Sequence, residues 1–260
     1  MAYSDFLSEV NSISKMTEQR PDYVMQSLGT LGGGNHFWEC SLDENGDKWL
    51  SIHSGSRNYG LKIANWHQKK AIVIHGKMNG LEYLEGDDAK LYFEHMKNAQ
   101  VFASLNRQVM AYSVIRSLEL DSFALESVES VHNYIDFEQG VIRKGAISAL
   151  KGERVVIPWN MRDGMIIGEG KGNPDWNNSA PHGAGRVMSR SAAKKNLSMD
   201  EFKKEMGGVW SSCISENTLD EAPMAYKDHS KIASLISPTV DVKLHLKPIY
   251  NFKAEEKKRF

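Results

Sequence analysis

The longest periodic pattern of apolar residues lies in the middle of the chain. Between Gly86 and Leu120, apolar side chains recur every three or four residues, at Tyr92, Met96, Ala99, Phe102, Leu105, Val109 and Tyr112. This spacing places them on one face of an α-helix. Asp87 and Asp88 stand at the end where the helix dipole favours negative charge. The pattern therefore predicts a long helix over 86–120.

Shorter patterns flank this helix. A helix is predicted within 61–78 and another over 198–206, where Ser198 and Glu201 have the spacing of a capping box. Short β-like runs, each ending in turn-forming residues, occupy 48–54, 128–137, 146–161 and 163–172. Repeats and Pro/Gly/Ser-rich linkers are absent from the sequence. The mixture of helical and β-like runs predicts an α+β fold with many turns. Histidines and glycines gather at the ends of the predicted strands, where loops commonly carry function.

Composition narrows the class of protein. The 260 residues include 32 Lys+Arg and 33 Asp+Glu, so any contact with nucleic acid would need a local patch rather than a basic surface. Cys40 and Cys213 are the only cysteines, which argues against a disulfide scaffold and fits a reducing compartment. The first 20 residues lack the pattern of a signal peptide, and apolar runs are too short for a membrane span. We expect a soluble, cytoplasmic protein.

The stretch GTLGGGNHFWE carries the first candidate site. Its three consecutive glycines allow positive φ and bring backbone N–H groups close to a bound anion. Asn35 can donate its amide to a phosphate, His36 can bind a metal, and Glu39 can accept from a base or sugar. The alternative is a tight turn that holds a hydrogen-bonded histidine.

Two further histidines follow β-like runs. His53 ends one run and is followed by small hydroxyl residues and Arg57, a composition suited to wrapping an oxyanion. His132 and Asn133 stand inside the run 128–137. Histidines from distant segments can form a metal site through tertiary folding, although their spacing in sequence does not prove one. The alternatives are a polar turn and a hydrogen-bonded core histidine.

The fourth candidate is the stretch SAPHGAGRVMSR. His182 follows a proline, and Gly183 and Gly185 leave space beyond it. Arg186 and Arg190 would share one face if a helix starts in this stretch. A neutral imidazole at a helix N-terminus with cations nearby is suited to attack phosphorus and to hand the group onward. The alternative is a histidine at a helix start with solvent-facing arginines.

These stretches, together with VHNY, KGAISALKGERVVIP and DEAPMAYKD, resemble in sequence and order the RtcB-type RNA ligases, the tRNA-splicing ligase family. The resemblance runs from about Gln26 to Lys253. It implies an α+β, RtcB-like single-domain fold, with the catalytic domain over 26–260, mixed or antiparallel sheets, flanking helices and the metal and nucleotide site at strand ends. Residues 1–25 would form a short N-terminal extension.

The family resemblance implies a specific reaction. Members join RNA ends carrying a 3′-phosphate or 2′,3′-cyclic phosphate to a 5′-hydroxyl, with GTP and manganese. A histidine takes GMP from GTP and passes it to the RNA 3′-phosphate, and the 5′-hydroxyl then displaces GMP. By motif position, His182 resembles that nucleophile, and His36, His53 and His132 resemble manganese ligands.

The resemblance also implies the binding residues. The residues expected to contact the nucleotide are Asn35, Glu39, Asn133, Gly183, Gly185, Tyr226 and Lys253. Among them, Glu39, Tyr226 and Lys253 resemble a guanine pocket. The residues expected to handle the RNA substrate are Arg57, Arg186 and Arg190.

The sequence also departs from the family pattern. Family members normally carry an earlier segment whose aspartate and cysteine complete the two-manganese site, and residues 1–27 contain nothing like it. Cys40 and Cys213 do not match that cysteine. Trp159 and Asn160 replace the usual Gly-Ser in a loop expected near phosphate, and Met224 replaces a glycine.

Three hypotheses follow. The first is an active ligase that uses fewer metal ligands or recruits the missing Asp/Cys segment from a second polypeptide. The second is a non-catalytic homologue that binds RNA ends or a nucleotide. The third is a metal-dependent phosphoesterase or nucleotidyltransferase with another substrate. Retention of the histidines, Arg186 and Lys253 favours the first.

Overall fold

The computed structural model describes residues 3–121 and 125–254. The chain forms two compact units, one made of Met1–Gly32 with Ser54–Ser122 and the other of Gly33–His53 with Phe123–Phe260. No helix among the described residues is both long and apolar enough to cross a membrane. The cytoplasmic location stays a prediction.

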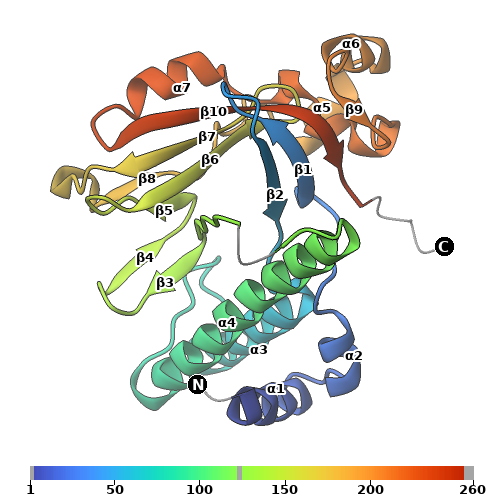
Figure 1. Ribbon diagram of the computed structural model, residues 1–260. Helices are drawn as coiled ribbons and strands as arrows, with labels where there is room; N and C mark the ends of the chain where they lie inside the picture. The colour runs from blue at the N-terminus through green and yellow to red at the C-terminus, as the bar shows by residue number, and fades with distance from the viewer. Residues whose placement is uncertain (1–2, 122–124, 255–260) are drawn as a thin grey trace. The chain divides into compact units, whose positions relative to one another are not determined.

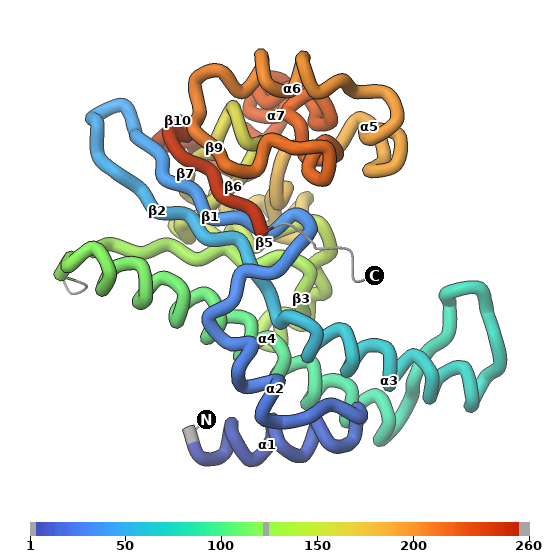
Figure 2. Tube along the Cα trace, turned by 90° about the vertical axis from the view of Figure 1, so that its right-hand side faces the viewer, coloured from blue at the N-terminus to red at the C-terminus, as the bar shows by residue number. Residues whose placement is uncertain are grey.

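The first unit is helical. It contains α1 (Tyr3–Met16), α2 (Pro21–Gln26), α3 (Arg57–His75) and α4 (Gly86–Ser117), and Figure 2 shows α3 and α4 running side by side. The helix predicted over 86–120 is confirmed. The helix predicted within 61–78 starts earlier, at Arg57, and ends at His75, directly before Gly76, whose φ of 75° suits a glycine.

The core of the helical unit includes the start of the chain. Its buried side chains come from all four helices: Phe6, Val10, Ile13, Val24, Tyr59, Ile63, Ala99 and Phe102. The spacing of the first three, at i, i+4 and i+7, is that of one helix face. The predicted division into a 1–25 extension and a 26–260 domain stays a prediction, but α1 contributes directly to this core.

The second unit is built on one sheet. Its strands are β1 (Phe37–Leu42), β2 (Lys48–His53), β6 (Arg154–Asn160), β7 (Gly164–Gly170), β9 (Trp210–Ser211) and β10 (Val240–Phe252). The order is β2-β1-β10-β7-β6, all antiparallel, with β9 pairing in parallel with β10. Figure 1 shows the long β10 between β1 and β7. This strand joins two local hairpins, β1–β2 and β6–β7, into one sheet.

Two short strand pairs complete the second unit: β3 (Tyr134–Asp136) with β4 (Val141–Arg143), and β5 (Ala146–Ser148) with β8 (Ser179–Pro181). The helices are α5 (Arg190–Asn196), α6 (Met199–Glu205), α7 (His229–Leu235) and the 3₁₀ helices η2 (Pro174–Trp176), η3 (Glu216–Glu221) and η4 (Pro223–Ala225). Buried Ile157, Ile166 and Ile236 lie in the main core of this unit. The α+β fold with a largely antiparallel sheet is confirmed.

Two local predictions are wrong. The strand predicted over 128–137 is limited to Tyr134–Asp136, because Asn133 has a φ of 56°, in the left-handed region, and ends the extended backbone. The helix predicted to start in AGRVMSR begins only at Arg190, where Ser189 caps it by accepting from Ala192 N–H. His182 therefore follows a strand and does not stand at a helix N-terminus. The cap at Ser198, which accepts from Glu201 N–H, is as predicted.

Candidate functional site

Three histidines meet at the ends of strands in the second unit. His36 comes directly before β1, His53 ends β2, and His132 lies just before β3. The Nε2 atoms of His53 and His132 are 3.2 Å apart, and the rings of His36 and His53 have centroids 5.8 Å apart. The antiparallel register, which pairs Phe37 with His53, brings the first two together. The sequence-predicted convergence of distant histidines is therefore present in the structure.

The chemistry of this cluster fits a divalent metal. Two nitrogen ligands of one metal ion, each at about 2.1 Å from it, lie about 3.0 to 3.4 Å apart, close to the separation of the two Nε2 atoms. Burial, reinforced by the neighbouring His132 and His36, lowers the pKa of His53 to about 3, so its imidazole is neutral, the form that binds metals. Within the described residues, however, no group of three or more His, Cys, Asp or Glu side chains already has the arrangement of a complete metal site.

His182 lies next to this cluster with a defined orientation. It directly follows β8, and its ring centroid is 4.7 Å from that of His132. Its Nδ1 donates to the carbonyl of Gly145 at 2.7 Å. Because a carbonyl can only accept, this bond places a proton on Nδ1, so the tautomer that fits is the one whose lone pair is on Nε2, the atom that would act as the nucleophile. The Gly145 N–H in turn donates to Asn133 Oδ1 at 2.8 Å.

A buried arginine holds the segments around His182 together. Arg143, at the end of β4, is 2% exposed. Its guanidinium donates to Asp136 at 2.7 Å and to the hydroxyls of Tyr134 and Ser179, each at 3.0 Å. It therefore joins the β3–β4 hairpin, which leads into Gly145, to the strand that leads into His182. Sequence reasoning missed this role, since a single arginine two residues before a glycine carries no signal.

The loop after His182 is packed tightly against its neighbours. A Cβ at Gly183 would lie 2.9 Å from the carbonyl oxygen of Pro158, and Ala184 N–H donates to that oxygen at 3.2 Å. Gly185 has a φ of 71° and accepts from Lys227 N–H at 3.0 Å. Both glycines are therefore required by local geometry. Their role in binding a nucleotide stays a prediction.

A second cluster in the same unit surrounds the carboxylate of Glu221. The hydroxyl of Tyr226 donates to Glu221 Oε2 at 2.5 Å, and Lys253 Nζ lies 3.5 Å from the same oxygen. Arg190 pairs with Oε1, and Arg186 Nη1 lies 3.7 Å from it. Arg186 and Arg190 thus converge as expected, but through a shared carboxylate rather than one helix face. Glu221 was missed, although the stretch DEAPMAYKD contains it.

Glu39 and Phe37 lie on β1 beside this cluster. Glu39 is buried and accepts from Asn251 Nδ2 at 2.7 Å and from Ser41 Oγ at 3.0 Å. Burial raises the pKa of Glu39 to about 7. Lys253 Nζ lies 5.5 Å from the centroid of the Phe37 ring, whose edge contacts His53 at a centroid distance of 5.4 Å. Phe37 therefore connects the histidine cluster to the Glu221 cluster.

The remaining predicted residues are placed as follows. Asn35 is exposed in the turn before β1. Arg57 belongs to the helical unit, where it donates to Leu31 O at 3.0 Å and to Thr30 Oγ1 at 3.2 Å. A Cβ at Gly32, whose φ is 82°, would overlap the Arg57 guanidinium. One glycine of the run is therefore needed to admit an arginine. Around the Cβ position of Gly34, by contrast, no described residue other than its chain neighbours has an atom within 4 Å.

The residues that depart from the family pattern have structural roles. Trp159 is buried in the main core, and Asn160 accepts from Arg162 and Asp163 N–H at 3.0 and 2.9 Å, which closes the β6–β7 turn. Cys213 is buried, and its Sγ bonds the backbone of Lys253. Cys40 lies on β1 opposite Tyr250, and Met224 packs at the edge of the core around Phe202.

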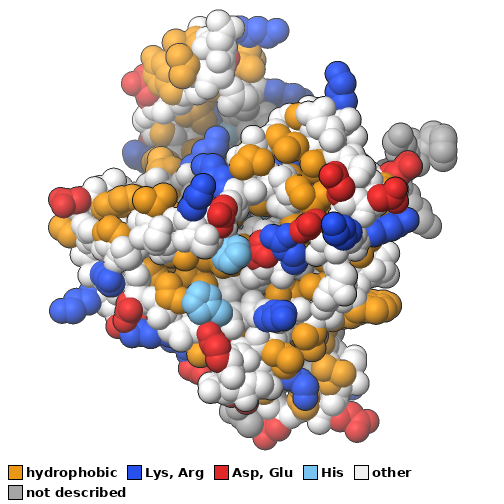
Figure 3. Space-filling model, turned by 90° about the horizontal axis from the view of Figure 1, so that it is seen from above, with side chains coloured by type: hydrophobic (Ala, Val, Ile, Leu, Met, Phe, Trp, Pro, Cys, Tyr) orange, Lys and Arg blue, Asp and Glu red, His pale blue; other side chains and the backbone are white. Residues whose placement is uncertain are grey.

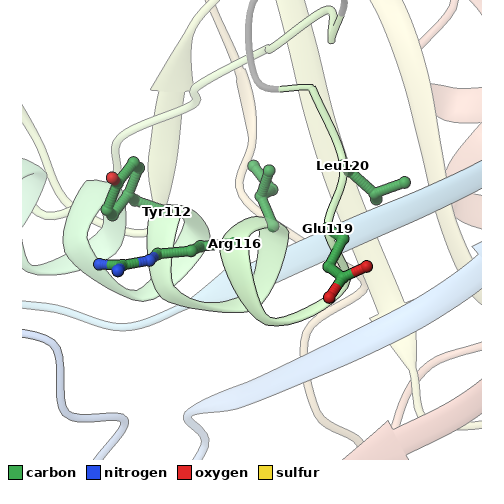
Figure 4. A pocket seen from close by; sticks show the side chains of 5 residues that line it. Tyr112, Arg116, Glu119 and Leu120 are labelled. Atoms are coloured by element: carbon green, nitrogen blue, oxygen red, sulfur yellow. The ribbon is translucent and has the colours of Figure 1, made fainter.

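The charges and the pocket described next point to no further candidate site among the described residues. On the face shown in Figure 3, Lys and Arg side chains lie among Asp, Glu and His side chains, as the near balance of charge predicts. A pocket at the C-terminal end of α4 is lined by Tyr112, Ile115, Arg116, Glu119 and Leu120 (Figure 4). Its lining includes no predicted site residue.

Comparison with known proteins identifies the family. The family model described as tRNA-splicing ligase RtcB matches residues 6–254. The chain belongs to the RtcB family. The match starts earlier than the motifs that begin near Gln26, and it includes most of α1. The family resemblance expected from the sequence is therefore confirmed.

Individual RtcB relatives show the extent of the similarity. The chain is 35% identical to the RNA-splicing ligase RtcB of Escherichia coli K12, over 87% of this chain and 62% of the relative. It is 30% identical to the tRNA-splicing ligase RtcB of Nanoarchaeum equitans, over 88% of this chain and 59% of the relative. The chain thus spans about three fifths of the length of these relatives.

Proposed function

We propose that this chain carries the nucleotide and metal site of an RNA ligase that joins a 3′-phosphate or 2′,3′-cyclic phosphate end to a 5′-hydroxyl end, using GTP and Mn²⁺. The observation that carries the proposal is the placement of His182. Its Nδ1–H is bound to a backbone carbonyl, and its ring lies beside the cluster of His36, His53 and His132. Family membership and the names of the relatives support the same reaction class.

The proposed chemistry uses the histidine as a carrier of GMP. His182 Nε2 attacks the α-phosphorus of GTP, a P–N bond forms, and pyrophosphate leaves. Where the RNA ends in a 2′,3′-cyclic phosphate, water first breaks the P–O2′ bond, which leaves a 2′-hydroxyl and a 3′-phosphate. An oxygen of the RNA 3′-phosphate then attacks the phosphorus of the bound GMP and breaks the P–N bond. Finally, the 5′-hydroxyl attacks the RNA phosphate, loses its proton, and expels GMP.

The residues of the chain divide the remaining tasks. His36, His53 and His132 would hold manganese, which when bound would offset the charge of approaching phosphates. Gly145 keeps the proton of His182 on Nδ1. Asn35 and Asn133 would contact phosphate, and the residues around Glu221 would contact the base. Arg57 would handle the RNA phosphate.

A second candidate function is a nucleotide- or RNA-end-binding homologue without ligase activity. It is favoured by the loop at Trp159 and Asn160, where the first side chain is buried in the core and the second bonds its own turn. A phosphate contact from this loop would have to come from the backbone.

The decisive experiment uses labelled GTP and Mn²⁺ and looks for an acid-labile covalent GMP adduct. We expect wild type to form the adduct, alone or with a separate polypeptide that supplies an Asp/Cys-containing segment. His182→Ala should lose it, and the matched control His245→Ala, which alters an exposed histidine of β10, should keep it. Absence of an adduct in both wild-type reactions would overturn the ligase proposal, and GTP binding without an adduct would support the second candidate. An adduct in His182→Ala would show that another residue is the nucleophile.

A further inference from the structure

Glu221 is a buried carboxylate with an unusual number of partners. It is 3% exposed, and its two oxygens face different groups. Oε2 accepts from Tyr226 and lies 3.5 Å from Lys253 Nζ, whereas Oε1 pairs with Arg190 and lies 3.7 Å from Arg186 Nη1. A single side chain therefore contacts four of the residues expected to bind nucleotide or RNA.

The backbone holds Glu221 in one place. It is the last residue of η3, which starts with a capping box between Ser215 and Thr218. Buried Leu219 and Ala222 lie on either side of it in the sequence, and η4 starts directly afterwards at Pro223. A carboxylate fixed in this way can orient flexible partners such as lysine and arginine, rather than follow them.

The negative charge of Glu221 stabilises the buried ammonium group of Lys253. Lys253 is only 3% exposed, and burial lowers its pKa while the carboxylate of Glu221 opposes that shift. An unpaired buried ammonium is costly, so loss of the carboxylate would drive Lys253 either to lose its proton or to move toward solvent.

The bond to Tyr226 has a consequence for ligands. Because the tyrosine donates its only proton to Glu221, its oxygen can only accept. It already accepts from Arg186 Nη1 at 3.3 Å and keeps a second lone pair, while the ammonium of Lys253 keeps further protons to donate. Together the two side chains offer an acceptor beside a donor. With the lysine facing position 6 of the base and the tyrosine facing position 1, the pair complements the carbonyl and the N–H of guanine. Adenine presents an amino donor and a bare ring nitrogen at the same two positions and therefore matches neither side chain.

We propose that Glu221 is a positioning residue that sets the base preference of the nucleotide pocket, by orienting Tyr226 and Lys253 through one oxygen and anchoring Arg186 and Arg190 through the other. This inference rests on the proposed function only in taking a guanine nucleotide as the ligand. Glu221 acts through its neighbours and has no direct part in the chemical step.

Asp220 provides a matched control. It is buried beside Glu221 in the same 3₁₀ helix, but its carboxylate pairs with Arg190 at 2.6 Å and with Lys194 at 3.3 Å. Neutralising Asp220 therefore removes a neighbouring negative charge of similar burial. It leaves the bonds from Glu221 to Tyr226 and Lys253 in place.

The test measures equilibrium binding of a fluorescent GTP analogue in the presence of Mn²⁺, with displacement by GTP and by ATP. Glu221→Gln should weaken GTP binding at least about tenfold, the scale of one lost charge-assisted contact. It should weaken ATP binding far less, so that the preference for GTP falls. Asp220→Asn should change the preference by less than about threefold.

Several outcomes would overturn the proposal. One is an equal loss of GTP and ATP binding, and another is a lower fraction of binding-competent protein with unchanged affinity, because both indicate a purely structural role. If Glu221→Gln does not fold, Tyr226→Phe removes only the oriented hydroxyl and should still reduce the preference for GTP. Wild type that binds GTP but forms no covalent adduct would refute the ligase reaction and leave this test valid. Wild type that binds no guanine nucleotide would refute both.

Discussion

Two pairs of histidines in this molecule are similar in their distances but differ in the side chains that surround them. In the helical unit, His67 Nε2 and His95 Nδ1 are 3.0 Å apart on α3 and α4. In the sheet unit, the Nε2 atoms of His53 and His132 are 3.2 Å apart. Both pairs contain a histidine whose pKa burial lowers, to about 4 for His67 and to about 3 for His53.

The surroundings separate the two pairs. The rings of Trp66 and Tyr92 pack edge-on against His67. His53 and His132 instead lie beside His36 and His182, which come from other segments of the chain. A close pair of imidazoles is therefore not by itself a site. Convergence of several segments is the feature that favours the His53–His132 pair as the candidate site.

Removing one histidine from each pair should affect the affinity for Mn²⁺ very differently. We expect His53→Ala to weaken Mn²⁺ binding at least about 100-fold, since loss of a ligand should cost at least as much as loss of a residue that orients one. His67→Gln should leave Mn²⁺ affinity within about threefold of wild type while reducing stability. Titration with Mn²⁺, followed by electron paramagnetic resonance of the free ion, measures both. Equal losses in the two variants would show that the pairs are not functionally different.

The orientation of the strand-end histidines should depend on Arg143. Arg143→Lys keeps the charge but loses the planar group that reaches Asp136, Tyr134 and Ser179, so we expect about 2–3 kcal/mol of lost unfolding free energy. Formation of the GMP adduct should slow as well, because the segments that lead into Gly145 and His182 are no longer joined.

Denaturant unfolding and the rate of adduct formation measure these effects. The matched control is Arg154→Lys, which alters a partly exposed pair with Glu126 and should cost less than about 1 kcal/mol. If Arg143→Lys behaved like this control, the buried arginine would not hold the hairpin in place.

The pair of His67 and His95 should make the unfolding free energy of the protein depend on pH. The pKa of His67 is lowered to about 4 in the folded protein, against 6.5 for an ordinary histidine. The unfolded chain therefore binds the proton more readily, so the stability contributed by neutral His67 is present above about pH 6.5 and is lost as the pH falls toward 4.

We expect this loss to reach about 1–2 kcal/mol in wild type and to be smaller in His67→Gln. Unfolding free energies of the two proteins at pH 7 and pH 5 measure it. Parallel curves would show that the pair is not responsible.

Sequence patterns predicted the local elements better than the contacts among them. The long helix α4 was visible because its apolar face and its acidic start are both local. The central strand β10 was missed, although Val240, Val242, Leu244 and Leu246 alternate as a half-buried strand requires. The helix considered for the stretch AGRVMSR begins only at Arg190, because Arg186 instead forms an isolated bridge with Tyr226, 40 residues away.

The candidate site shows the same limit. Histidines and glycines could be picked out because their residue types are suited to metals and phosphates. Glu221 and Gly145 could not, since one is an ordinary carboxylate and the other acts through its backbone carbonyl. Their roles follow only from partners that tertiary folding brings near, such as Lys253, 32 residues beyond Glu221.

The place of β10 in the sheet has a consequence for how the protein is made. The hairpins β1–β2 and β6–β7 are local and can form soon after they are synthesised, but β10 must pair with a strand of each. Its pairing with β1 joins residues about two hundred positions apart, as in Trp38 with Phe252. During translation the strand edges that pair with β10 therefore stay unpaired until β10 has been synthesised, and unpaired edges can form incorrect strand pairings. Lys253 directly follows β10, so its contacts with Glu221 and Phe37 can form only after β10 has been synthesised.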